Sequence, residues 1–244
     1  MIRETVACVA ACAMLLACAG DNKGASARQG SSDRAATADS VVRPRAVGAP
    51  DGARTVLFLG TSLTAGLGLD ADSAYPQRIQ RKIDSVGLAY QTVNAGVSGE
   101  TSAGLLRRLD WVLQAPAAVI VVETGANDGL RGQPVEGTKA TIGAVLTRIA
   151  KERPEAKVVL VQMEAPPNMG ADYTRAFHAM FPALAAEHRV TLLPFLLDGV
   201  AGRVELNQGD GVHPNDVGER MVAGNVWRGL EGILRGTSER RARS

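Results

Sequence analysis

The chain has 244 residues, of which 45% are hydrophobic, and a formal net charge of +2 at pH 7. Its arginines are scattered and accompany no nucleic-acid-binding motif, so we expect no nucleic-acid partner. All three cysteines, Cys8, Cys12 and Cys18, lie near the N-terminus. The rest of the chain can therefore form neither a disulfide nor a thiolate metal site.

Residues 1–17, MIRETVACVAACAMLLA, are typical of a secretory signal, because an arginine precedes an apolar run that ends in small residues. The run is too short to be favoured as a retained transmembrane helix, which needs roughly 20 apolar residues. The LLAC sequence resembles a bacterial lipobox, and this implies a lipidated Cys18 at the mature N-terminus. Ala19 then favours the outer membrane, facing the periplasm. The alternative is an ordinary signal peptide and a periplasmic or secreted protein.

The domain boundaries follow from composition. Residues 18–53 contain the candidate lipidated cysteine and then a stretch rich in Gly, Ala, Ser and Asp without apolar periodicity, which predicts a disordered tether. Residues 54–236 are expected to form one folded domain, and residues 237–244 a polar tail. We expect the protein to be a monomer.

From residue 54 the chain alternates apolar strand candidates with helix-period segments. The predicted strands are 55–60, 89–96, 117–123, 157–163 and 190–195. The predicted helices are a stripe of Ile79, Ile83 and Val86, residues 100–113, a stripe from Ile142 to Ile149, residues 171–188 and residues 214–235. This alternation predicts an α/β fold, a flavodoxin-like three-layer α/β/α sandwich around a five-stranded parallel sheet of order 2-1-3-4-5.

Four polar loops follow strands or precede the last helix: 60–68, 96–104, 124–132 and 207–215. Ligands of such sheets bind outside the carboxyl ends of the strands, where the strand order reverses. We therefore expect Ser62 and Asn127 to face each other across that crevice.

The first of these loops, GTSLTAGLG, has several interpretations. A phosphate-binding P-loop is disfavoured because Leu67 stands where the lysine should be, and the dinucleotide pattern fails after Gly68. FMN binding and a simple strand-to-helix turn stay open at this point. A nucleophilic Ser62 needs a base and an orienting group, and His213 with Asp210 three residues before it supplies both.

His178 and His188 lie among alanines and charged residues of a predicted helix, far along the chain from any strand-end loop, and we expect them to be surface or packing residues. Three histidines without a cysteine or clustered carboxylates argue against a metal site.

Four blocks in order, GTSLTAG, SGET, GAND and DGVHP, resemble the sequence blocks of the SGNH, or GDSL, hydrolases. Longer runs such as ETGANDGLRG and EAPPNMGADYT resemble the bacterial arylesterase, acyl-thioesterase and lysophospholipase group. The resemblance covers residues 54 to about 235. One residue departs from it, because Thr61 replaces the commoner aspartate before the serine.

The resemblance implies a serine hydrolase of acyl esters, thioesters or lysophospholipids that uses no cofactor. Ser62 would be the nucleophile, His213 the general base and Asp210 its orienter. The oxyanion hole would be formed by the backbone N–H groups of Ser62 and Gly99 and the side-chain amide of Asn127. Two alternatives are a carbohydrate O-deacetylase on the same fold and a catalytically inactive, surface-binding lipoprotein.

Overall fold

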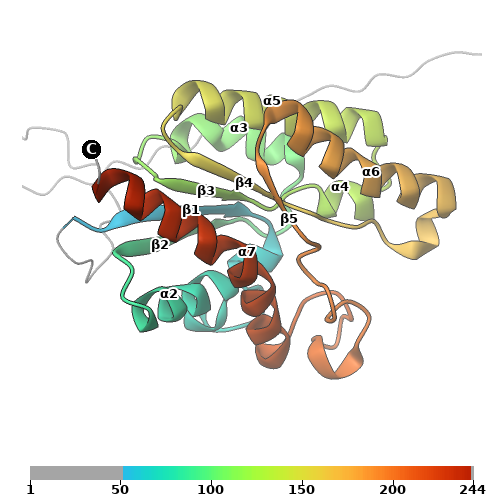
Figure 1. Ribbon diagram of the computed structural model, residues 1–244. Coiled ribbons are helices and arrows are strands. Elements are labelled where there is room, and N and C mark those ends of the chain that lie inside the picture. The colour runs from blue at the N-terminus through green and yellow to red at the C-terminus, as the bar shows by residue number, and fades with distance from the viewer. Residues whose placement is uncertain (1–51, 243–244) are drawn as a thin grey trace, which may run out of the picture. The chain divides into compact units, whose positions relative to one another are not determined.

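The computed structural model of the protein describes residues 52–242 (Figure 1). The candidate signal peptide, Cys18 and almost all of the predicted tether lie outside these residues. None of the helices between residues 52 and 242 combines the length and the apolar character needed to cross a membrane.

The five strands form one parallel sheet of order β2-β1-β3-β4-β5, which confirms the predicted fold. The strands are β1 Arg54–Gly60, β2 Tyr90–Gly96, β3 Val119–Val122, β4 Lys157–Val161 and β5 Thr191–Leu193. The helices are α1 Ser62–Ala65, α2 Tyr75–Ser85, α3 Ser102–Val112, α4 Ala126–Leu130, α5 Val135–Glu152, α6 Ala171–His188 and α7 Asp216–Ala242. Three short 3₁₀ helices are η1 Ala71–Ser73, η2 Pro167–Met169 and η3 Val204–Leu206.

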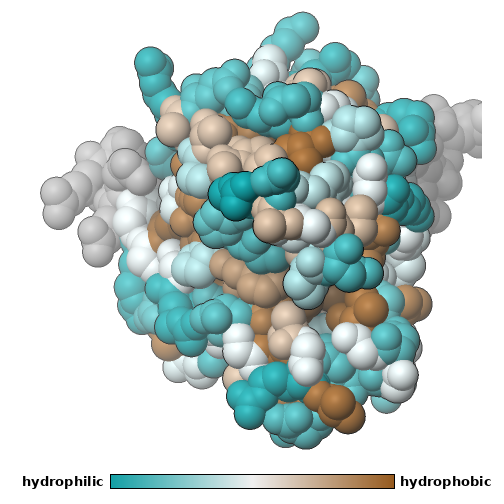
Figure 2. Space-filling model, turned by 90° about the vertical axis from the view of Figure 1, so that its right-hand side faces the viewer, coloured by the Kyte–Doolittle hydropathy of each residue, from teal (hydrophilic) through white to brown (hydrophobic). Residues whose placement is uncertain are grey.

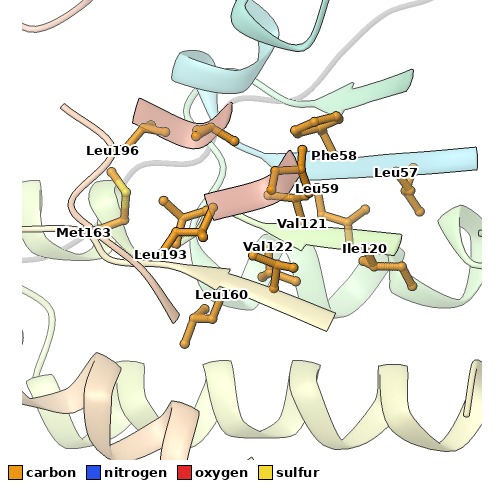
Figure 3. Packing of buried hydrophobic residues seen from close by; sticks show 14 of the residues in the cluster. Leu57, Phe58, Leu59, Ile120, Val121, Val122, Leu160, Met163, Leu193 and Leu196 are labelled. Carbon is orange, nitrogen blue, oxygen red and sulfur yellow. The ribbon is translucent and has the colours of Figure 1, made fainter. Parts of the chain in front are cut away.

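The sheet lies between two layers of helices. Helices α3, α5 and α6 cover one face, and α2 and α7 cover the other (Figure 1). Strands that are covered on both faces have apolar side chains at consecutive positions. Figure 3 shows this core around the three central strands, where β1, β3 and β4 contribute the buried residues Leu57, Phe58, Leu59, Ile120, Val121, Val122 and Leu160.

The predicted helical stripes pack as expected, with one exception. Ile142 and Ile149 of α5 and Ile79 and Ile83 of α2 are fully buried. Val86 is exposed, because α2 ends at Ser85 and the chain turns away at Val86. Tyr75 and Pro76, at the start of the helix, complete its buried face instead.

The last helix is longer than the sequence predicts. It continues beyond residue 236, where the polar tail was expected to begin, and ends at Ala242. Its last turns are tied to the first strand, because the guanidinium of Arg54 donates to the Thr237 carbonyl and to Ser238 Oγ, both at 3.0 Å. These contacts join the two ends of the described chain.

Candidate active site

The loop after β1 places Ser62 at the carboxyl edge of the sheet. Thr61 caps the one-turn helix α1, and Ser62 is its first residue. The turn is tight: a Cβ atom on Gly60 would lie 2.0 Å from Thr64 Oγ1, so this position needs glycine. The helix ends at Gly66, which has a φ of +74°. Helix α1 was not expected from the sequence, because a single turn has no apolar periodicity.

His213 reaches the serine from the loop before α7. Its Nε2 lies 2.8 Å from Ser62 Oγ, although the two residues are 151 positions apart in the chain. The loop is held in shape by a backbone bond from the Gln208 N–H to the His213 carbonyl at 2.7 Å. The Gln208 side-chain amide also donates to the Leu67 carbonyl at 2.7 Å, which ties the histidine loop to the serine loop.

Asp210 lies on the far side of the imidazole. Its Oδ2 is 2.6 Å from His213 Nδ1, and its Oδ1 accepts the backbone N–H groups of His213 and Val212 at 3.0 and 2.9 Å. These bonds to the charged form, led by the His213 backbone N–H, lower the pKa of Asp210 to about 2. An ionised Asp210 accepts a hydrogen bond from Nδ1–H, which leaves the Nε2 lone pair free to accept a hydrogen bond from the Ser62 hydroxyl.

The predicted oxyanion donors come from three neighbouring loops. As the first residue of α1, Ser62 has a backbone N–H without an intrahelical partner. Asn127 lines the same cavity as Ser62, and its amide donates one hydrogen bond to the Glu100 carbonyl at 3.0 Å. Gly99, next to Glu100, has a φ of +76°, and its carbonyl accepts a bond from Arg131 at 3.0 Å. The Asn127–Glu100 bond thus joins the loops of Asn127 and Gly99.

Two buried carboxylates hold these loops, and neither was assigned a role from the sequence. Asp128 is 4% exposed and accepts the backbone N–H and the hydroxyl of Ser102, at 2.8 and 2.6 Å. Glu123 is fully buried and accepts bonds from Thr61 and Thr64 of the serine loop. For Glu123 the sequence did contain a signal, because it is an acidic residue that directly follows an apolar strand. A carboxylate buried at such a position needs hydrogen-bond donors, and these indicate a structural role.

A cavity of about 400 Å³ opens beside Ser62 and His213. Its wall is mostly apolar and includes Leu63, Leu130, Met163, Ala165, Phe195 and Leu197. Leu130 is 47% exposed, and Val212, which also lines the cavity, is 40% exposed. Figure 2 shows the face of the molecule that lies on the right-hand side in Figure 1, the side toward which β1 runs. On this face brown hydrophobic residues are interspersed with teal hydrophilic ones.

The other two histidines differ in their surroundings. His188 packs beside Gly143 of α5. His178 is exposed, as expected of a surface residue, and its Nδ1 is 2.7 Å from Glu164, in the loop after β4. Glu164 lines the cavity. Across residues 52–242, no three His, Cys, Asp or Glu side chains are grouped so as to hold a metal ion.

A serine hydroxyl in contact with a carboxylate-oriented histidine, at the carboxyl edge of a five-stranded parallel sheet covered on both faces, is the arrangement of a serine hydrolase on a flavodoxin-like α/β/α fold. A comparison with models of known protein families identifies the family within that class. The chain belongs to the GDSL-like lipase/acylhydrolase family, which matches residues 58–221. The resemblance found in the sequence is thereby confirmed, and the protein is an ester hydrolase of this family.

Characterised relatives cover most of the chain. Esterase TesA of Pseudomonas aeruginosa is 37% identical over 183 residues, which are 75% of this chain and 90% of the relative. Thioesterase 1/protease 1/lysophospholipase L1 of Escherichia coli K12 is 36% identical over 75% of this chain and 86% of the relative. The solved structure of the psychrotrophic esterase EstA from a Pseudoalteromonas species, inhibited by monoethylphosphonate, has a TM-score of 0.71 at 32% identity and covers 75% and 99% of the two chains.

Proposed function

We propose that the protein hydrolyses carboxylic esters or thioesters with an apolar acyl group, using Ser62 as the nucleophile. The observation that carries this proposal is the Ser62–His213–Asp210 chain of hydrogen bonds, which ends at the wall of a mostly apolar cavity. The substrate classes of the relatives, esters, thioesters and lysophospholipids, agree with it.

In the first half of the reaction, Ser62 Oγ attacks the acyl carbon while its proton moves to His213 Nε2. Asp210 accepts the hydrogen bond from His213 Nδ1–H throughout the reaction and stabilises the imidazolium that forms. The tetrahedral intermediate then collapses. The bond to the alcohol or thiol breaks, and the leaving group takes the proton from Nε2.

In the second half, water replaces the leaving group. His213 Nε2 takes a proton from the water as its oxygen attacks the acyl-serine, and a second tetrahedral intermediate forms. This intermediate releases the carboxylic acid and returns the proton to Ser62 Oγ. The enzyme ends the cycle in its starting protonation state without a cofactor.

The negative oxygen of each intermediate needs neutral donors that are already in place. We propose that these are the backbone N–H groups of Ser62 and Gly99 and the second amide hydrogen of Asn127. The bond from Asn127 to the Glu100 carbonyl supports this, because it fixes the amide plane and leaves the other N–H free for substrate. Donors that need no reorganisation during the reaction stabilise the transition state most effectively.

The cavity favours a longer acyl chain over an acetyl group. An acetyl group has one methyl to bury, whereas a cavity of about 400 Å³ with Met163, Phe195 and Leu197 in its wall accommodates an alkyl chain. Burial of each methylene contributes about 0.8 kcal/mol to binding. The carbohydrate O-deacetylase alternative therefore has less support than a (thio)esterase.

A hydrolysis panel tests this function. Acyl length is varied from acetyl to palmitoyl on p-nitrophenyl, coenzyme A and lysophospholipid leaving groups, and we expect kcat/KM to rise as the chain lengthens beyond acetyl. Maximal activity on acetyl esters of carbohydrates would favour the deacetylase instead. If every substrate is inert and a fluorophosphonate does not label Ser62, the protein is an inactive binding protein.

We also propose that the enzyme is a monomer lipid-anchored in the bacterial cell envelope, at the periplasmic face of the outer membrane. The support is the lipobox-like LLAC sequence with Ala19 after it. Mass spectrometry of the mature protein should find a diacylglyceryl-modified Cys18 at the N-terminus, and a Cys18→Ser variant should escape this processing. An unmodified N-terminus at another residue would refute the anchor and indicate a periplasmic or secreted enzyme.

A further inference from the structure

We propose that Glu123, a buried residue with no part in the triad or the oxyanion hole, is the positioning residue that holds the Ser62 turn in its reactive geometry. The proposal rests on the proposed role of Ser62 as the nucleophile. In this proposal Glu123 does not contact the substrate, and it acts on Ser62 through Thr61.

The first support is the convergence of donors on one carboxylate. The Thr61 backbone N–H donates to Glu123 Oε2 at 2.8 Å, and Thr61 Oγ1 lies 3.0 Å from both carboxylate oxygens. Thr64 Oγ1 donates to Oε2 at 2.9 Å. These donors stand on either side of Ser62 in the chain. One side chain, directly after β3, therefore fixes both the peptide before the serine and the turn after it.

The second support is where Glu123 is anchored. Its backbone N–H donates to the Leu59 carbonyl at 2.8 Å, so its backbone continues the pairing of β3 with β1. A residue fixed to the central strands is a rigid support for a short turn. The fit is close, because a Cβ atom on Gly60 would lie 2.7 Å from Glu123 Oε2.

The third support is the chemistry of the group. Burial raises the pKa of Glu123, and the bonds from Thr61 and Thr64 oppose this by stabilising the carboxylate. Two further titratable groups face this region, Tyr75 of α2, whose hydroxyl is 2.8 Å from Thr64 Oγ1, and Glu219 of α7. A buried carboxyl group is costly in an apolar core, and here donors from the serine turn satisfy it.

This arrangement also fits the threonine at position 61. A threonine hydroxyl can donate to Glu123, whereas an ionised aspartate offers only acceptors. An aspartate at this position would place two carboxylates against each other, and the pair would need to share a proton. Thr61 thus matches an acceptor at position 123.

The test compares three variants in the full protein. Glu123→Gln keeps the size of the side chain but replaces one acceptor oxygen with an NH₂ donor that faces the donors of Thr61 and Thr64. We expect kcat to fall about 10- to 100-fold with KM within about twofold of wild type, since a small displacement of a reacting atom has an effect of this size. Thr61→Val, which removes only the Oγ1 bonds, should lower kcat about threefold to tenfold.

The matched control is Glu219→Gln, which alters a buried carboxyl group of the same region without a bond to the serine turn. It should leave kcat near the wild-type value at pH 7. The double variant Thr61→Val/Glu123→Gln should lose no more kcat than Glu123→Gln alone, because both changes break the same contact. The rate of Ser62 labelling by a fluorophosphonate should follow kcat across the series.

The outcomes separate this proposal from the assignment of Ser62. Absence of Ser62 labelling in the wild type would overturn the proposed function itself. If Ser62 is labelled, four results would each overturn the positioning role. Two concern Glu123→Gln: a wild-type kcat, or a change in KM without a change in kcat. The other two are kcat losses that multiply in the double variant and a kcat loss in Glu219→Gln equal to that in Glu123→Gln. If Glu123→Gln does not fold, Thr61→Val decides, and wild-type kcat in that variant would refute the proposal.

Discussion

The carboxyl group of Glu219 should make the stability of the protein fall as the pH rises through neutrality. Glu219 lies on α7 and is 1% exposed, and its Oε2 has no hydrogen-bond partner within residues 52–242. Burial is the main reason why its pKa is raised to about 8, and the nearby carboxylates of Glu123 and Asp216 add to the effect. The Tyr75 backbone N–H and the charge of Arg78 oppose it.

The size and direction of the effect follow from proton linkage. Between the ordinary pKa of 4.5 and the folded-state pKa of about 8, the folded protein holds a proton on Glu219 that the unfolded chain has released. The contribution of the neutral group to stability is complete below pH 4.5 and is lost as the pH rises toward 8. The shift corresponds to a change on the order of 5 kcal/mol, a large share of the stability of a typical domain.

The assay compares wild type with Glu219→Gln, whose amide resembles the protonated acid and does not titrate. Urea denaturation at pH 5, 6, 7 and 8 gives the free energy of unfolding of both proteins. We expect similar values at pH 5 and a growing advantage of the variant at pH 7 and 8. Glu123 is present in both proteins, so the difference reports the titration of Glu219 together with its coupling to Glu123. Parallel pH profiles would refute the reasoning.

Four further changes test the site. Ser62→Ala should reduce ester hydrolysis by several orders of magnitude with unchanged circular dichroism, and labelling of another serine by a fluorophosphonate would contradict this. Asn127→Ala should lower kcat by about 100- to 1,000-fold, whereas an effect on KM alone would make it a binding residue. Asp210→Asn should lower kcat by about 10⁴-fold through loss of the required tautomer, a loss that near-normal turnover would exclude. Thr61→Asp should unfold more readily above neutral pH because of Glu123, and a tenfold gain in kcat/KM would show that the site needs a charge there.

The sequence alone was sufficient for the topology and for the family, and it predicted which residues form the site. Apolar runs without alternation can be buried only on both faces of a sheet, and helices between them require parallel strands. The carboxyl ends of such strands meet at one edge, so the polar loops that contain Ser62 and Asn127 had to lie together. The order of blocks around Ser62 and His213 then indicated the family.

The tertiary structure decided what depends on contacts between distant segments. The distance from Ser62 Oγ to His213 Nε2, the shape of the apolar cavity and the donors around Glu123 each combine loops that are far apart in the chain. The same holds for Glu219, whose raised pKa comes from burial of α7 against α2, and for the extension of α7 past residue 236. A periodic pattern shows which face of a helix is buried but not which residue it meets, and the ionisation of a buried carboxyl group depends on that partner.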